Sequence, residues 1–176
     1  MWYVVQVTNG QEAKVCELVN RTVARMQPEA ANQLLHECFV PSYQAERKVH
    51  GQWQTVSRNL FPGYVIAVTD HVEDLNRALR GVRTFTRILG NEQAFIPLDR
   101  AEMAFIESFT SKKSRTIPMS KAVAEGDSIR VIEGPLHGHE GWISQVNRRK
   151  GTALVEMSMF GRTISVEIGL AVVSAE

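Results

Sequence analysis

Residues 1–110 alternate between short apolar runs and segments whose apolar residues recur at helical spacing. Four runs are rich in Val, Ile or aromatic residues, which indicates strands: 2–8, 34–40, 61–69 and 85–89. Helical spacing predicts three helices, at 9–26, at 70–80 and from Asp99 to residue 109, and residues 44–59 resemble a hairpin. This order is the split βαβ pattern, so we predict an α+β domain that is ferredoxin- or RRM-like, an antiparallel sheet of about four strands flanked by helices.

The pattern changes after residue 124, where short apolar runs alternate with turn residues and no helical period appears. Strands are predicted at 128–133, 141–147, 152–158 and 163–167. A small, bent β-barrel explains this second domain, because closing the sheet removes its unpaired edges. Residues 111–124 are rich in Ser and Lys and contain few apolar residues, so we predict a flexible basic linker between domains at 1–110 and 125–176.

Composition and charge limit the kinds of protein that this chain can be. The chain has 176 residues and a formal net charge of +1, so any nucleic acid must be held by local patches. No apolar run approaches a membrane span, and the first residues lack the features of a secretory signal. Cys16 and Cys38 lack metal-ligand spacing. These features predict a cytoplasmic protein with reduced thiols and no membrane contact.

The stretch around which the first domain is organised is Leu60-Phe61-Pro62-Gly63-Tyr64-Val65. Pro62 donates no backbone hydrogen bond and Gly63 permits unusual backbone angles, so the pair predicts a bend or bulge at a sheet edge. A ring stands on each side of it. Phe61 and Tyr64 either fill the domain's own core or form aromatic anchors for a partner's apolar surface.

Several motifs, in order and spacing, resemble the NusG family of transcription elongation factors over essentially the whole chain. They are Trp2-Tyr3-Val4-Val5, the stretch at 60–65, Glu125-Gly126-Asp127, Gly134-Pro135, Gly138, Gly141 and Met159-Phe160-Gly161-Arg162. The resemblance implies an N-terminal NGN domain that docks on RNA polymerase and a C-terminal KOW domain of SH3-like barrel type. Residues 136–141, the ending at 166–170 and the arm at 50–53 look more like the specialised antiterminator subgroup LoaP, which implies processive antitermination.

For the NGN domain, the resemblance favours docking of the rings over core burial. It implies that the clamp helices of the largest polymerase subunit contact a face made of Tyr3, Arg58, Phe61, Pro62, Gly63 and Tyr64. On this view Phe61→Ala weakens polymerase binding while the fold survives. Arg58 and Lys48 meet acidic polymerase residues or DNA phosphates near the transcription bubble, or remain solvated surface charges.

For the KOW domain, the resemblance implies that three loops gather at one end and form a basic rim that grips an RNA hairpin of the nascent transcript. Their residues are His137, His139, Arg148, Arg149, Lys150 and Arg162. The alternative is the use made by the housekeeping factor, in which Phe160 binds a termination factor or a ribosomal protein. Phe160 is equally compatible with a ring that caps the barrel.

An enzyme is not predicted. His137-Gly138-His139-Glu140 lacks a fourth metal ligand at a suitable spacing, and no Gly-rich phosphate loop or activated nucleophile is found. We therefore expect a monomer that has no cofactor and no metal, with RNA polymerase as its main partner.

Overall fold

The computed structural model describes residues 1–26 and 28–173. The chain forms two compact units, and each is built from two stretches. Met1–Pro41 and Phe61–Met103 make the first unit, and Ser42–Leu60 and Ala104–Glu176 make the second. No helix in the described part of the chain is long and apolar enough to span a membrane.

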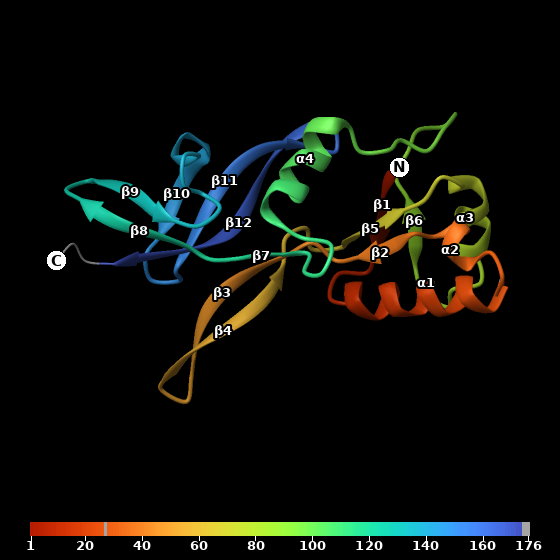
Figure 1. The fold of residues 1–176 in the computed structure, drawn as a ribbon, viewed down its shortest axis with the longest axis horizontal. Coiled ribbons are helices and arrows are strands. Elements are labelled where there is room, and N and C mark those ends of the chain that lie inside the picture. Colours follow the sequence, from red (N-terminus) through yellow and green to blue (C-terminus); the bar gives the residue numbers. More distant parts are fainter. Residues whose placement is uncertain (27, 174–176) are drawn as a thin grey trace. The chain divides into compact units, whose positions relative to one another are not determined.

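The first unit contains a four-stranded sheet in the order β2-β5-β1-β6 (Figure 1). Its strands are β1 (Trp2–Val7), β2 (Glu37–Phe39), β5 (Tyr64–Val68) and β6 (Thr86–Ile88). All neighbouring pairs are antiparallel. This confirms the predicted α+β domain with an antiparallel sheet.

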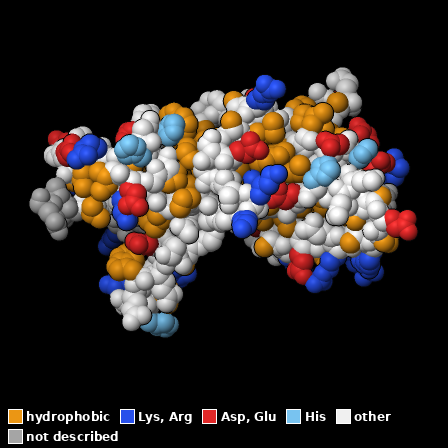
Figure 2. Space-filling model, in the orientation of Figure 1, with side chains coloured by type: hydrophobic (Ala, Val, Ile, Leu, Met, Phe, Trp, Pro, Cys, Tyr) orange, Lys and Arg blue, Asp and Glu red, His pale blue; other side chains and the backbone are white. Residues whose placement is uncertain are grey.

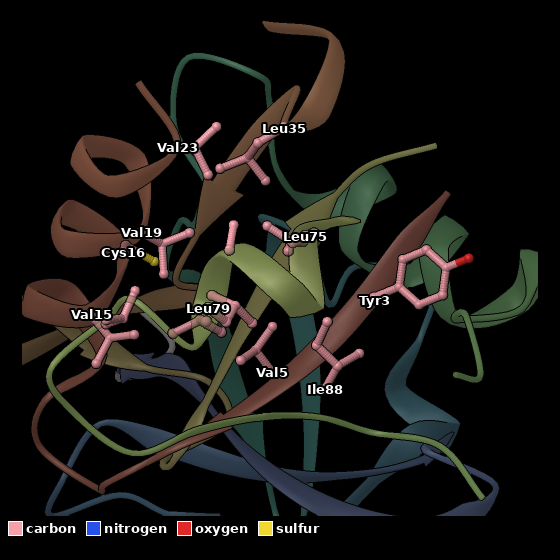
Figure 3. Close-up of a cluster of buried hydrophobic side chains, with 14 of the residues drawn as sticks. Tyr3, Val5, Val15, Cys16, Val19, Val23, Leu35, Leu75, Leu79 and Ile88 are labelled. Carbon is pink, nitrogen blue, oxygen red and sulfur yellow. The ribbon is translucent and has the colours of Figure 1, made fainter. Parts of the chain in front are cut away.

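The helices of the chain are α1 (Glu12–Met26), α2 (Ala31–Leu34), α3 (Val72–Leu79) and α4 (Arg100–Phe109). In β1, Tyr3, Val5 and Val7 face one side of the sheet, because alternate residues of a strand share a face. Apolar side chains of α1 and α3 pack on that side, and Figure 3 shows this cluster. The helix predicted to begin at Asp99 is confirmed by a capping box: Asp99 and Glu102 exchange side-chain to backbone bonds of 2.8 Å each.

The strand predicted at 34–40 is shorter than expected. Leu34 ends α2 and only Glu37–Phe39 pairs in the sheet. Leu34 and Leu35 are both buried in the apolar cluster. A short apolar run satisfies burial in either a helix or a strand, so its sequence did not decide between them.

The second unit contains a hairpin and a half-barrel. The hairpin strands β3 (Ser42–Val49) and β4 (Gln52–Asn59) pair over their whole length. The half-barrel is a five-stranded sheet in the order β10-β11-β12-β8-β9 (Figure 1). Its strands are β8 (Ser120–Glu125), β9 (Ser128–Glu133), β10 (Ile143–Asn147), β11 (Thr152–Met159) and β12 (Arg162–Val173), with a short helix η1 (Glu140–Trp142) before β10.

The flexible linker predicted at 111–124 is wrong for much of its length. Thr116–Ile117 forms β7, which pairs in parallel with β3, and β8 is a full strand of the half-barrel. Ile117 and Ala122 are fully buried. Ser120 is buried too, and its hydroxyl accepts a hydrogen bond from the backbone N–H of Leu136 at 3.0 Å. The polar composition of residues 111–124 therefore gave no indication that a few residues of this segment are buried.

Candidate partner-binding surfaces

The bend at residues 61–64 is held by a buried carboxylate. The backbone N–H of Gly63 donates to Oε1 of Glu12 at 2.7 Å, and its carbonyl accepts from the N–H of Val7 at 2.8 Å. Gly63 has φ +86°, which favours glycine. Glu12 lies on α1 and is only 2% exposed. Nothing in the sequence around Glu12 indicated that its carboxylate is buried and holds the bend.

The rings at the bend do not form the exposed pair that was predicted. Phe61 is 4% exposed and Tyr3 is 6% exposed, so both are core residues. In Figure 3, the hydroxyl of Tyr3 points away from the apolar cluster. Pro62 is exposed and Tyr64 is half-buried. The prediction of Phe61 as an exposed docking anchor is therefore wrong, and Tyr3, predicted to belong to the same face, is part of the apolar cluster of the sheet.

The hairpin contacts β12 through one carboxylate. Tyr43 donates its phenol proton to Oε1 of Glu167 at 2.8 Å, and the Arg58 guanidinium lies 3.6 Å from the same oxygen. A Cβ on Gly169 would lie 2.1 Å from the Gln44 carbonyl oxygen, so only glycine permits this approach. Arg58, predicted to face the polymerase or DNA, thus pairs with Glu167 in this structure.

Titration of Tyr43 is expected to report this contact. Burial, followed by the hydrogen bond to Glu167, raises the pKa of Tyr43 from 10.0 to about 12. A raised pKa means that the folded state holds the proton more tightly, so the stabilisation is present below pH 10.0 and is lost as the pH rises through about 12. The difference in phenolate absorbance between the native chain and Tyr43→Phe should show one ionisation near 12. An ionisation near 10 would mean that the contact is not formed in solution.

The three loops of the predicted basic rim do not gather at one end. Arg148, Arg149 and Lys150, here called the basic turn, precede β11, whereas Arg162 follows it. Thr152 and Met159 lie at opposite ends of the β11–β12 ladder. Because a strand rises about 3.4 Å per residue, these two ends are about 24 Å apart. The prediction of a single rim is wrong for Arg162. On the face of the molecule that Figure 2 shows, basic and acidic side chains are interspersed.

The two histidines of the predicted rim also differ. His137 is exposed, but His139 is half-buried in an aromatic cluster. Its ring stacks on Trp142 at 4.2 Å between centroids and meets the Phe109 ring edge-on at 5.7 Å. His139 therefore has a packing role that the sequence did not indicate. Among the described residues, no group of three or more His, Cys, Asp or Glu side chains is arranged to hold a metal.

Phe160 stands at the tip of the β11–β12 hairpin. Its φ is +57°, an uncommon value for a non-glycine residue with a bulky side chain, and its side chain is half-buried. Gly161 beside it has φ +72°, so the two residues form a tight turn in the left-handed region. Backbone strain of this kind is often kept at functional sites.

Comparison with known proteins relates this chain to a family. The family described as "Transcription termination factor nusG" matches residues 1–107, and the KOW motif matches residues 125–156. The NusG protein of Lactococcus lactis is 32% identical over 173 residues, covering 96% of this chain and 89% of that protein. The chain belongs to the NusG family. Members of this family are transcription termination and antitermination factors, not enzymes.

Other relatives agree with this assignment. The NusG protein of Pasteurella multocida is 28% identical over 168 residues, covering 95% of this chain and 90% of that protein. The solved structure titled "Domain interaction in Thermotoga maritima NusG" covers 97% of this chain and 92% of its own, with a TM-score of 0.58 and 20% identity, and so shares the fold. Both sequence relatives carry the name "Transcription termination/antitermination protein NusG". The narrower LoaP assignment stays a prediction.

Proposed function

We propose that this chain is a general elongation factor of the NusG type, which acts in the cytoplasm on RNA polymerase and binds a second ligand through its half-barrel. The observation that carries the proposal is the match of both family descriptions in sequence order, at 1–107 and 125–156. The names of the relatives favour the general factor over LoaP.

The polymerase contact in this proposal uses the exposed part of the bend. Pro62 is exposed and Tyr64 is half-buried, and the Glu12–Gly63 bond fixes the backbone between Pro62 and β5. A fixed bend loses little conformational entropy on binding. The clamp helices of the largest subunit are the proposed partner. A protein that binds the closed clamp more tightly than the open clamp stabilises the closed state. The size of this effect is set by the difference between the two binding free energies.

Nascent RNA is one candidate for the second ligand. All three residues of the basic turn are exposed, and none forms an ion pair within residues 1–26 and 28–173. Unpaired cations on a turn can contact phosphates at a small desolvation cost, and such binding weakens as salt rises. This supports RNA binding at the basic turn in place of the wider rim.

A protein partner is the second candidate. It is favoured by the unusual backbone of Phe160, which presents an aromatic ring on a tight turn at the other end of β11. Aromatic residues on preorganised turns are common binding anchors. A termination factor or a ribosomal protein would be the partner here, as proposed for the housekeeping factor.

Single-round transcription through a terminator, on templates with and without a leader hairpin, tests the proposed function. We expect the full chain to change pausing and read-through on both templates, because a general factor acts through the polymerase. The variant with alanine at all three positions of the basic turn should keep this effect. Read-through that needs the leader and is lost in this variant would indicate the specialised factor. No change on either template would refute the proposal.

A further inference from the structure

A hollow of about 170 Å³ lies between the hairpin and the half-barrel, within the second unit. Trp53 of β4 and Glu46 of β3 line one side, and the basic turn and β12 line the other. This volume is well below the roughly 300–1,000 Å³ of sites for drug-sized ligands. The hollow therefore has room for a single planar ring system and not for a double helix.

Trp53 is the unusual member of this hollow. Its side chain is 61% exposed, whereas Trp2 in the first unit is 8% exposed. A tryptophan left in water exposes a large apolar surface, for which burial would be favourable. Its backbone is held in place, because β4 pairs with β3 along the whole hairpin.

The charge around the ring is positive. Lys48 is the cross-strand partner of Trp53, and directly opposite residues of an antiparallel pair project from the same face. The basic turn lines the hollow with three cations, against the single carboxylate of Glu46, and Lys48 stands opposite the ring in the hairpin. An exposed ring flanked by cations is the combination with which proteins hold single-stranded nucleic acids: bases stack on the ring and phosphates meet the cations.

We propose that this hollow holds one unpaired nucleotide of a single-stranded nucleic acid, with its base stacked on Trp53 and the adjacent phosphates on the basic turn. The inference rests on the proposed RNA contact of the half-barrel and deepens it, because it adds a residue of the hairpin and makes the ligand single-stranded. A paired base is already stacked on its neighbours and cannot stack on a side chain without leaving the helix. The nascent transcript and an exposed DNA strand share this chemistry.

Binding of the full chain to labelled oligonucleotides of about 12 nucleotides tests the inference. Oligouridine, the matching DNA strand and an RNA duplex of the same length are compared over a range of salt concentrations. The variants are Trp53→Ala, Trp53→Phe and the triple alanine variant of the basic turn. Thr55→Ala, an exposed position on the same strand, is the matched control.

Trp53→Ala should weaken single-strand binding about tenfold with an unchanged salt dependence, because it removes the stacking of one base, which releases no counterions. Trp53→Phe should keep most of the affinity, and Thr55→Ala should keep all of it. The triple variant should instead flatten the salt dependence, by up to about 2 in the slope of log K against log salt for three phosphate contacts. Tighter binding of RNA than of DNA would identify the transcript as the source, and the reverse order would identify the DNA strand.

Two results overturn the inference and are distinguishable. If Trp53→Ala binds as tightly as the native chain while the triple variant loses affinity, the stacking site is refuted and the RNA contact of the basic turn survives. If the native chain binds no oligonucleotide at low salt, the RNA contact fails as well. Preference for the duplex, unaffected by Trp53→Ala, also excludes an unpaired nucleotide in the hollow. Thermal melting of each variant confirms that the fold is intact.

Discussion

Replacing Phe61 with alanine is expected to lower the free energy of unfolding by about 3–5 kcal/mol. The ring is 4% exposed, and the adjacent Leu60 is 3% exposed, so truncation removes buried apolar surface and leaves a cavity. This is a large part of the total stability of a small domain. Denaturant unfolding of the native chain and the variant measures the loss.

Pro62→Ala is the matched control for this experiment. Pro62 is the next residue and is exposed, so its replacement should change stability by no more than about 0.5–1 kcal/mol. If Phe61→Ala kept its full stability and lost only its affinity for polymerase, the ring would be a docking anchor after all. The buried position of Phe61 argues against that result.

Replacing Gly134 with alanine is also expected to have a large effect. It should lower the free energy of unfolding by about 2–5 kcal/mol. Gly134 has φ +99°, and a Cβ there would lie 2.6 Å from the Ser120 Cα and 2.8 Å from the Met119 carbonyl oxygen. Backbone atoms cannot move aside as a flexible side chain can. The clash would separate the loop from the start of β8, where Ser120 binds the Leu136 N–H. Thermal unfolding measures the effect.

Gly138→Ala separates the two causes. Gly138 has a similar φ of +79°, but nothing lies within 4 Å of the position of its Cβ. Its replacement should therefore lower the free energy of unfolding by only about 1 kcal/mol, which is the cost of placing a Cβ on a left-handed backbone. The difference between the two variants measures the close approach at Gly134. Equal losses would show that backbone angle alone explains both.

The regular elements were predictable because each has a local cause. Apolar residues at helical spacing predicted α1 and α3, and alternating or β-branched runs predicted the strands of both units. The capping pair Asp99 and Glu102 marked the start of α4. In each case the residues that determine the element lie within a few positions of one another.

The features that sequence reasoning missed depend on contacts between distant residues. Burial of Phe61 and the bond from Gly63 to Glu12 require knowledge of which elements meet. The linker prediction failed because Ile117 pairs with Tyr43, which lies far away in the sequence. One local signal was available: Gly169 inside an apolar run is typical of a close backbone approach, and it lies against Gln44.

The contact between β3 and β12 has a consequence for the order in which the chain is made. The hairpin is complete by residue 60, but Glu167 and Gly169, which it touches, belong to β12 and follow much later in the sequence. During synthesis the side of the hairpin that meets β12 stays uncovered until β12 has left the ribosome. The exposed residues of β4 other than Trp53 are polar, and a hydrophilic surface limits aggregation before β12 arrives.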